Sequence, residues 1–268
     1  MQAHYIDLSL FQVLVAVGLI LINGLISLLL GLKLERTLVI GAVRMTVQLM
    51  LVGLVLNWVF GIGHWYLVLI MMSIMTAIAG YTAVDRVSVR YSGIRYISMF
   101  SVWAGSWVVT ALALFFIIQV KPWYTPQYAI PLLGMILGNI LNGISLGLER
   151  FTHDLESKRA QVETVLALGG TSWEAARPHV SAAVRAGMVP IINTMMVAGI
   201  VTLPGMMTGQ LLAGVHPVAA VKYQIVIIFL IAVATGVGTI SGVLLSYRRL
   251  FNASHQFLHF RLTSSKKS

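Results

Sequence analysis

Residues 149–178 read Glu-Arg-Phe-Thr-His-Asp-Leu-Glu-Ser-Lys-Arg-Ala-Gln-Val-Glu-Thr-Val-Leu-Ala-Leu-Gly-Gly-Thr-Ser-Trp-Glu-Ala-Ala-Arg-Pro and form the most polar stretch of a very hydrophobic chain. The wider segment 149–185 carries 10 charged residues out of the chain's 18 basic and 8 acidic ones. Long apolar segments stand on both sides of it. A polar segment in this position predicts a water-exposed element between membrane spans.

This polar segment is predicted to be a pair of helices. Residues 149–168 contain no Gly or Pro and can form one helix, which Gly169 and Gly170 end because Gly readily adopts the left-handed conformation after a helix. Thr171 and Glu174 have capping-box spacing and can start a second, shorter helix, which Pro178 kinks or ends. Such a stiff pair is suited to docking a partner, but an ordinary surface hairpin of helices would give the same pattern.

The composition is that of an integral membrane protein. Of the 268 residues, 58% are hydrophobic and only 10% are charged, whereas soluble domains carry about 25% charged residues. The net charge of +10 comes from short basic runs beside apolar segments, which is typical of membrane topology and does not indicate a nucleic-acid partner. The absence of cysteine excludes disulfides, thiolate nucleophiles and Cys-based metal sites.

Seven segments are long and apolar enough to cross a bilayer, which requires about 20 residues. They are 8–32, 37–60, 65–84, 97–118, 128–148, 186–203 and 222–246. The first lacks the basic flank of a signal peptide, so we expect a retained span. The predicted fold is all-α: a polytopic membrane protein with about seven transmembrane helices, a cytoplasmic helix pair and a single transmembrane domain over residues 1–268.

Basic residues orient these spans. Fifteen Lys and Arg residues lie in loops on one side or in the tail, whereas only Lys121 and Lys222 lie on the opposite side. The positive-inside rule therefore places the N-terminus outside, and both the C-terminus and residues 149–185 in the cytoplasm.

Residues 204–217 fit neither a span nor a free loop. They are too apolar for a loop, and too short and too interrupted by Gly and Pro to cross the membrane. A re-entrant or interfacial segment fits best, because irregular backbone at membrane depth must be buried in protein or line a wet cavity. Its candidate hinge residues are Pro204, Gly205, Met206, Met207, Thr208, Gly209 and Gln210. The last residues, 263–268, are expected to be a solvated tail.

Polar side chains inside spans are costly, so each of them requires a reason. Arg44 and Gln48 are spaced i, i+4 and share one face of the second span. They could line a translocation path. Alternatively, Arg44 extends to the inner interface and Gln48 bonds a neighbouring helix.

The fifth span carries a polar stripe. Asn139, Asn142, Ser145 and Glu149 fall within an arc of about 120° on a helix. The stripe could line a translocation path, or it could make interhelical hydrogen bonds at a packed or dimeric interface. Two Gly-x-x-x-Gly spacings on the same helix favour close helix approach, and both interpretations can hold.

Two further patterns are weaker. Gly143, Ser145 and Gly147 match G-x-S-x-G, but a hydrolase elbow needs a strand–turn–helix context rather than an apolar helix. Met206 and Met207 belong to a chain with 13 methionines. Their thioethers suit soft metals such as Cu(I), or they provide flexible apolar packing. No Walker A sequence occurs, so this chain is not expected to bind ATP by a P-loop.

The polar segment also matches a known spacing. Five residues separate Glu163 from Gly169, as in the cytoplasmic EAA loop of ABC-transporter permeases, which docks on the ATPase subunit. Thr164 and Val165 replace the two usual alanines, and the usual downstream Ile-x-Leu-Pro is absent.

Over nearly its whole length, the chain resembles the FetB family of ABC permeases, which are proposed iron exporters and include plant aluminium-tolerance permeases. The similar stretches are 41–49, 131–150, 163–176 and 201–220. The resemblance implies a permease subunit of the plasma (bacterial inner) membrane that pairs with a second copy of itself and with separate ATPase subunits. ATP and Mg would bind those partners, and no cofactor is expected in this chain.

The resemblance also implies roles for residues of the helix pair. Gly169 and Gly170 would form the turn that enters the ATPase groove, and Trp173 would be the apolar anchor beside it. The docking residues expected on this basis are Glu163, Gly169, Gly170, Trp173 and Glu174.

The cargo and the direction of transport stay open at this point. Iron export is proposed for bacterial members of the family and a nucleotide sugar for a plant member, so the cargo is an ion or a small solute. The alternative class is an ATP-independent secondary transporter or channel. That class would need ion-coupling carboxylates in the spans, and none of the eight Asp and Glu residues lies in mid-span. A permease subunit is not expected to be an enzyme.

The distribution of basic residues predicts the topology. A cytoplasm-active reporter fused after Ser268 should be active, and an export-active reporter at the same place should be silent, because the side with fifteen basic residues stays in the cytoplasm. The reverse pattern would place residues 149–185 outside and contradict the orientation.

Overall fold

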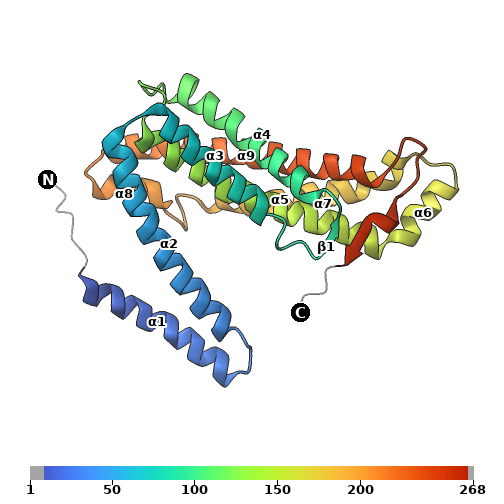
Figure 1. Ribbon diagram of the computed structural model, residues 1–268, viewed down its shortest axis with the longest axis horizontal. Helices are drawn as coiled ribbons and strands as arrows, with labels where there is room; N and C mark the ends of the chain where they lie inside the picture. The colour runs from blue at the N-terminus through green and yellow to red at the C-terminus, as the bar shows by residue number, and fades with distance from the viewer. Residues whose placement is uncertain (1–8, 265–268) are drawn as a thin grey trace.

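The computed structural model describes residues 9–264 of the chain, and these are almost entirely helical (Figure 1). Residue 8, where the first predicted span begins, and residues 265–268 lie outside the described part. The elements, in chain order, are α1 (Leu10–Leu29), α2 (Glu35–Ile62), α3 (Trp65–Thr82), β1 (Val89–Tyr91), α4 (Ile94–Leu112), the π-helix η1 (Ala113–Ile117), α5 (Pro126–Ser157), α6 (Arg159–Ala167), α7 (Ser172–Val197), α8 (Gly205–Leu212), α9 (Pro217–Leu250), the 3-10 helix η2 (His259–Arg261) and β2 (Leu262–Ser264).

The predicted number of spans is confirmed. Seven helices in the described part of the chain are long and apolar enough to cross a membrane, with α4 and η1 forming one of them. The all-α prediction is also confirmed, apart from the short pair of strands. The fifth and seventh spans are longer than predicted, because α5 continues to Ser157 and α9 covers Pro217–Leu250.

α5 is the central helix of the bundle. It begins at Pro126, whose fixed φ and missing N–H suit the first turn of a helix, and it packs against α3, α4, α7 and α9. A Cβ added at Gly143 would lie 2.6 Å from Thr235 Cγ2, and one added at Gly187 of α7 would lie 2.5 Å from the Gly143 oxygen. The three helices α5, α7 and α9 therefore approach so closely that only glycine fits at these two positions.

α1 and α2 form a hairpin that projects from the bundle (Figure 1). Ser27 closes its turn: the Oγ atom donates to the Glu35 carboxylate at 2.9 Å and accepts from the Leu34 N–H at 2.9 Å. The apolar side chains of both helices are mostly exposed. Lipid tails are as apolar as these side chains, so such exposure is compatible with a bilayer.

The structure corrects the predicted first helix of the polar segment. Residues 149–168 do not form one helix, because the chain breaks at Lys158, which has φ −106° and ψ 24° and separates α5 from α6. The break redirects α6 so that Val162 is buried and α6 packs on α7. No Gly or Pro marks this point in the sequence, because tertiary packing rather than local preference causes the break.

The second helix was predicted to be short and to kink or end at Pro178, and the structure shows that it is neither short nor ended there. α7 continues through Pro178 and Pro190 to Val197, so the polar segment and the sixth span share one helix. A proline inside a helix costs about 3 kcal/mol or more. Burial of Ala176, Ala183 and other side chains of α7 against the bundle offsets that cost.

The expected solvated tail is wrong for residues 263 and 264. Leu262–Ser264 form β2, which pairs antiparallel with β1 and places Thr263 opposite Arg90. The neighbouring Tyr91 is buried, and its hydroxyl lies 2.6 Å from Ser246 Oγ of α9. Burial raises the pKa of the Tyr91 phenol, so this link stays neutral and hydrogen-bonded. Strands of three residues leave no periodic pattern in a sequence, which is why this pairing was not predicted.

The glycine contact between α5 and α7 leads to a stability prediction. Gly187→Ala should lower the thermal unfolding temperature in detergent, because the new Cβ meets the backbone oxygen of Gly143, which cannot rotate away. Overpacking of this kind costs about 1–3 kcal/mol. Gly24→Ala on α1 is the control, since nothing lies within 4 Å of its added Cβ. Equal unfolding temperatures for the two variants would show that the contact is not tight.

Candidate functional site

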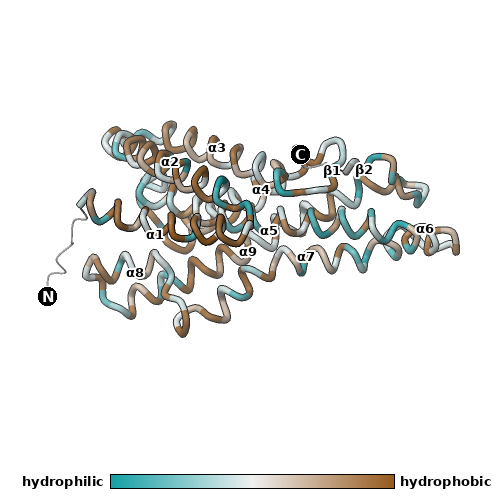
Figure 2. The backbone as a smooth tube through the Cα atoms, turned by 90° about the horizontal axis from the view of Figure 1, so that it is seen from below, coloured by the Kyte–Doolittle hydropathy of each residue, from teal (hydrophilic) through white to brown (hydrophobic). Residues whose placement is uncertain are grey.

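The candidate site lies at the end of the molecule where α5, α7 and α9 extend past the bilayer. α5 has 32 residues and α9 has 34, so at 1.5 Å per residue they are about 48 and 51 Å long, against about 30 Å of hydrocarbon. We call the projecting part the stalk: residues 149–176 and 247–262. Hydrophilic residues gather at this end, around α6, β1 and β2 (Figure 2).

A tight turn connects α6 to α7 at the tip of the stalk. The Gly169 N–H donates to the Leu166 oxygen at 3.1 Å and the Gly170 N–H donates to the Val165 oxygen at 3.0 Å, which is a Schellman motif. Gly169 has φ +86°, so it takes the left-handed conformation predicted for this turn. Gly170 has no positive φ, but a Cβ there would lie 2.8 Å from the Val165 oxygen. Both glycines are therefore needed, for different reasons.

The capping box predicted after this turn is confirmed. Thr171 Oγ1 accepts from the Glu174 N–H at 3.2 Å, and Glu174 Oε2 accepts from the Thr171 N–H at 2.7 Å. The two bonds fix the first turn of α7 directly after Gly170. Loop, turn and helix start are thus held as one rigid unit.

Trp173 and Leu168 are the large apolar side chains beside the turn. Trp173 is 42% exposed, and its ring packs edge-on against Tyr247 of α9, with 5.4 Å between the centroids. Leu168 precedes the glycines and is 84% exposed. The prediction considered Trp173 and missed Leu168, although an apolar residue directly before a glycine turn was visible in the sequence.

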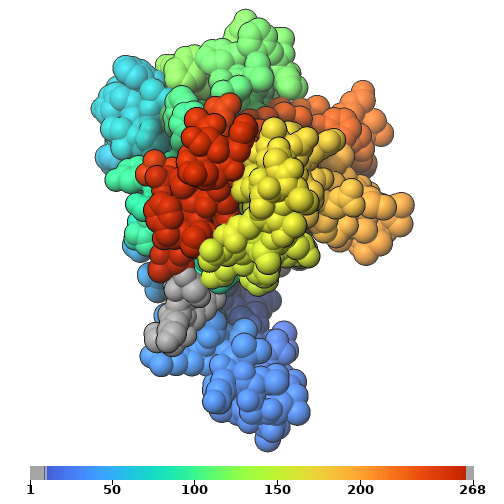
Figure 3. All heavy atoms as spheres, turned by 90° about the vertical axis from the view of Figure 1, so that its right-hand side faces the viewer, coloured from blue at the N-terminus to red at the C-terminus, as the bar shows by residue number. Residues whose placement is uncertain are grey.

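The C-terminal segment folds back onto the same end of the stalk. His255 Nδ1 accepts from the Ser172 N–H at 3.1 Å, and Ser172 Oγ lies 2.8 Å from Tyr247 Oη. Figure 3 shows the C-terminal segment in red beside the α6 region in yellow. Glu163 of α6 is paired with Arg159 at 2.7 Å and lies 3.9 Å from His259 Nδ1. Glu163 therefore lies where α6 meets the C-terminal segment.

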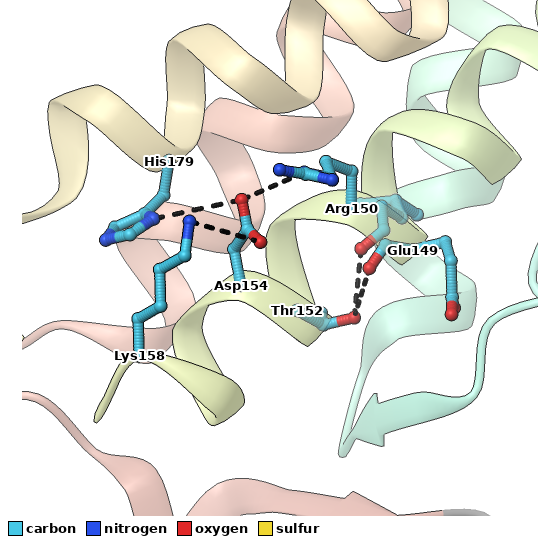
Figure 4. A network of polar contacts seen from close by, with 7 residues as sticks. Glu149, Arg150, Thr152, Asp154, Lys158 and His179 are labelled. Carbon is cyan, nitrogen blue, oxygen red and sulfur yellow. Dashed lines mark hydrogen bonds and ion pairs between the residues drawn. The ribbon is translucent and has the colours of Figure 1, made fainter. Parts of the chain in front are cut away.

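A buried carboxylate organises the inside of the stalk (Figure 4). Asp154 of α5 is 3% exposed. It accepts from Arg150 Nε at 2.9 Å, and it lies 3.7 Å from Lys158 Nζ and 4.0 Å from His179 Nδ1 of α7. A buried charge must be paired: Arg150 and Lys158 supply that pairing at the end of α5, and the His179 ring of α7 lies beside the same carboxylate. The sequence prediction missed it, because His179 is distant along the chain.

The residues of the polar stripe of α5 lie in different environments. Glu149 accepts from the Ser88 N–H and from Ser88 Oγ, both at 2.6 Å, so it holds the loop before β1. Asn142 is exposed, and its Oδ1 accepts from Arg86 Nη1 at 3.4 Å. The other members stay within α5: Asn139 donates to its own helix at Met135, and Ser145 is buried.

Arg44 and Gln48 are not brought together with that stripe. Both lie exposed on α2, and no hydrogen bond within residues 9–264 connects them to α5. Their role in a translocation path remains a prediction, as does that of the stripe.

The segment predicted to be broken contains a short helix, α8, between two turns. It follows Pro204 and includes Gly205, Met206, Met207, Thr208, Gly209 and Gln210. Met206 packs against the hydrophobic core, and the Gln210 Oε1 atom is buried. Within the described residues, no three His, Asp or Glu side chains gather as a metal site. Metal binding by Met206 and Met207 remains a prediction.

The chain is similar to known membrane proteins over nearly its whole length. The model of the Uncharacterised protein family (UPF0014) matches residues 10–251. A UPF0014 membrane protein of Synechocystis sp. is 40% identical over 85% of this chain and 88% of that protein. The "Probable iron export permease protein FetB" of Escherichia coli is 30% identical over 91% of this chain and 92% of that protein.

A plant protein is also similar to this chain, whereas no solved structure matches it. Protein ALUMINUM SENSITIVE 3 of Arabidopsis thaliana is 28% identical over 90% of this chain and 87% of that protein. The family match therefore includes residues 149–176 of the stalk as well as the spans.

The Asp154 cluster predicts a local change in stability. Asp154→Ala should speed amide hydrogen exchange in residues 150–170 and leave the spans protected, because Arg150 and Lys158 lose their buried partner. Loss of a charged hydrogen bond costs about 1.5–3 kcal/mol. Glu163→Ala is the control, since it breaks an exposed pair that is worth about 0–1 kcal/mol. If both variants exchange alike, Asp154 does not hold the stalk together.

Proposed function

This chain belongs to the UPF0014 family, and on that premise we propose that it is the membrane-spanning permease subunit of an ATP-driven exporter. The ATPase is a separate chain, which binds ATP and Mg. The permease has no catalytic step of its own: it moves cargo by changing which side of the membrane its helices open to.

The observation that carries this proposal is the continuity of α7. The helix starts at Ser172, directly after the glycine turn at the tip of the stalk, and runs without interruption to Val197 inside the sixth span. A displacement of the turn is therefore transmitted along a helix rather than absorbed by a loop. Such transmission is what coupling of ATP hydrolysis to transport requires.

The tip of the stalk has the features of a docking surface. Leu168 at 84% exposure and Trp173 at 42% exposure flank a rigid turn. Leu168 is the more accessible anchor, because part of Trp173 already packs on Tyr247. In this proposal, the ATPase binds this surface. Glu163 and Glu174 belong to the structure that holds the glycine turn in place.

A second copy of the chain completes the transporter. The flank of α5 that carries Gly138, Asn142 and Leu146 is exposed in the single chain. A polar asparagine on an exposed flank of a membrane helix calls for a protein or water neighbour rather than lipid. Two copies facing each other here would enclose a path lined by the α5 stripe.

We propose a metal ion, iron first, as the cargo. The support is the name of the Escherichia coli relative. In this proposal, the cargo contacts are the amides of the stripe and the thioethers of Met206 and Met207 on α8. Export is the direction, and the chain lies in the plasma membrane with its stalk in the cytoplasm.

Co-purification from native membranes tests the class of transporter. A stoichiometric ATPase subunit should accompany the chain, and its hydrolysis should rise with the cargo metal. Purification of a functional transporter without any ATPase would favour a secondary transporter instead.

A substitution at the tip tests the docking surface. Leu168→Asp should remove the ATPase in a pull-down at matched expression, because a carboxylate would be buried without a partner at the interface. A buried anchor is worth about 2 kcal/mol or more, which is roughly a thirtyfold loss of affinity. Leu168→Met is the control, since it keeps an apolar side chain of similar volume. Full retention of the ATPase by Leu168→Asp would remove this residue from the interface.

A further inference from the structure

A groove runs between α3 and α4. It consists of two adjoining cavities of about 510 Å³ and about 410 Å³, and Met99 lines both. The first lies at the ends of the two helices, between Tyr81 and the segment 90–96. The second continues along both helices toward Trp107. The groove therefore starts at a membrane boundary and enters the span.

The boundary cavity is basic and already held in shape. The Arg95 guanidinium lies over the Tyr81 ring, 4.4 Å from its centroid. Arg90 donates from Nε to the Val87 oxygen and from Nη2 to the Asp85 oxygen, both at 2.9 Å. These contacts fix two guanidinium groups before any ligand arrives, which lowers the entropy cost of binding.

The positive charge of this cavity is not neutralised by the protein. None of its lining residues is acidic, and no ion pair in the described part of the chain involves Arg90, Arg95 or Arg249. Arg249 adds a third guanidinium, whose Nε lies 3.8 Å from the position of a Cβ on Gly93. An anion is the ligand that such a cavity accepts.

The second cavity is mostly apolar, and its two hydroxyl groups, those of Ser73 and Thr76, donate to the Leu69 and Met72 oxygens of their own helix. Met99, Phe100, Trp103 and Ala77 line it, and the Trp107 Nε1 atom donates to Thr76 Oγ1 at 3.0 Å, which satisfies its polar edge. Arg95 and Trp107 are 12 residues apart on α4, or about 18 Å at 1.5 Å per residue. That length is close to half of the hydrocarbon core, which is about 30 Å thick. The apolar part of the groove thus has the depth of one leaflet.

We propose that this groove is a binding site for an anionic glycerophospholipid. Its phosphate lies at Arg90 and Arg95, and one acyl chain lies along Met99, Trp103 and Trp107. Basic pockets between transmembrane helices bind anionic headgroups in this way. Free phosphate would use only the boundary cavity and would leave the apolar one without a role, so the lipid fits both halves.

A lipid bound in this groove would affect the base of the stalk, because of where the groove lies. The segment that carries Arg90 is β1, which pairs with β2 of the C-terminal segment, and Ser88 beside it is held by Glu149 of α5. A lipid bound to Arg90 and Arg95 would therefore brace the base of the stalk. Bound anionic lipid should raise the thermal unfolding temperature of the purified chain.

The test is native mass spectrometry of the purified protein titrated with phosphatidylglycerol or with phosphatidylcholine of the same acyl chains. Phosphatidylglycerol should be retained in preference. Arg95→Gln should weaken its binding about fivefold, since one basic residue near a lipid phosphate is worth that factor. Arg36→Gln is the matched control, because it removes one exposed arginine at the start of α2. Its retention of phosphatidylglycerol should be unchanged.

A second pair of variants tests the apolar half. Ala77→Trp fills the groove and should reduce phosphatidylglycerol binding, whereas Ala16→Trp, at an exposed position of α1, should not. Equal retention of both lipids, or equal binding by Arg95→Gln and Arg36→Gln, would overturn the proposal. Displacement of phosphatidylglycerol by millimolar inorganic phosphate together with normal binding by Ala77→Trp would also overturn it, in favour of a free phosphate site.

Discussion

The rest of the structure depends on the close contact of α5, α7 and α9 at Gly143 and Gly187. In a bilayer, the hydrophobic effect does not drive helices together, so association depends on packing at small residues. Here the backbone oxygen of Gly143 occupies the space of a Cβ on Gly187, and Thr239 of α9 closes the third side. The helices α5, α7 and α9 are thereby fixed to one another, and α6 and the glycine turn are fixed to them.

Outside the bilayer, the stalk depends on a different force. Asp154 is a buried charge whose neighbours come from α5, from the break at Lys158 and from α7. The capping box and the Schellman motif then fix the backbone of the tip, and Tyr247 and His255 hold the start of α7 against α9 and the C-terminal segment. The result is a rigid element at the end of a continuous helix. In the proposed transporter, this element receives the motion of the ATPase.

The segment between α3 and α4 connects the two proposed sites. Its Ser88 binds Glu149 at the base of the stalk, and its Arg90 and Arg95 line the groove that we assign to a lipid. β2 pairs with the same segment and brings the C-terminal residues to the stalk. Lipid occupancy and ATPase docking would thus act on one connected unit that includes β1.

Local chemistry allowed much of this molecule to be predicted from sequence. The spans follow from apolar length, and the turn at Gly169 and the cap at Thr171 follow from residue types a few positions apart. The break at Lys158, the passage of α7 through Pro178 and the burial of Asp154 beside His179 do not. Each of these depends on contacts between residues from distant parts of the chain, and such contacts produce no periodic or local pattern in the sequence. The sequence by itself therefore determined the membrane helices and the glycine turn, whereas tertiary packing decided how α7, the C-terminal segment and the α3–α4 groove are joined.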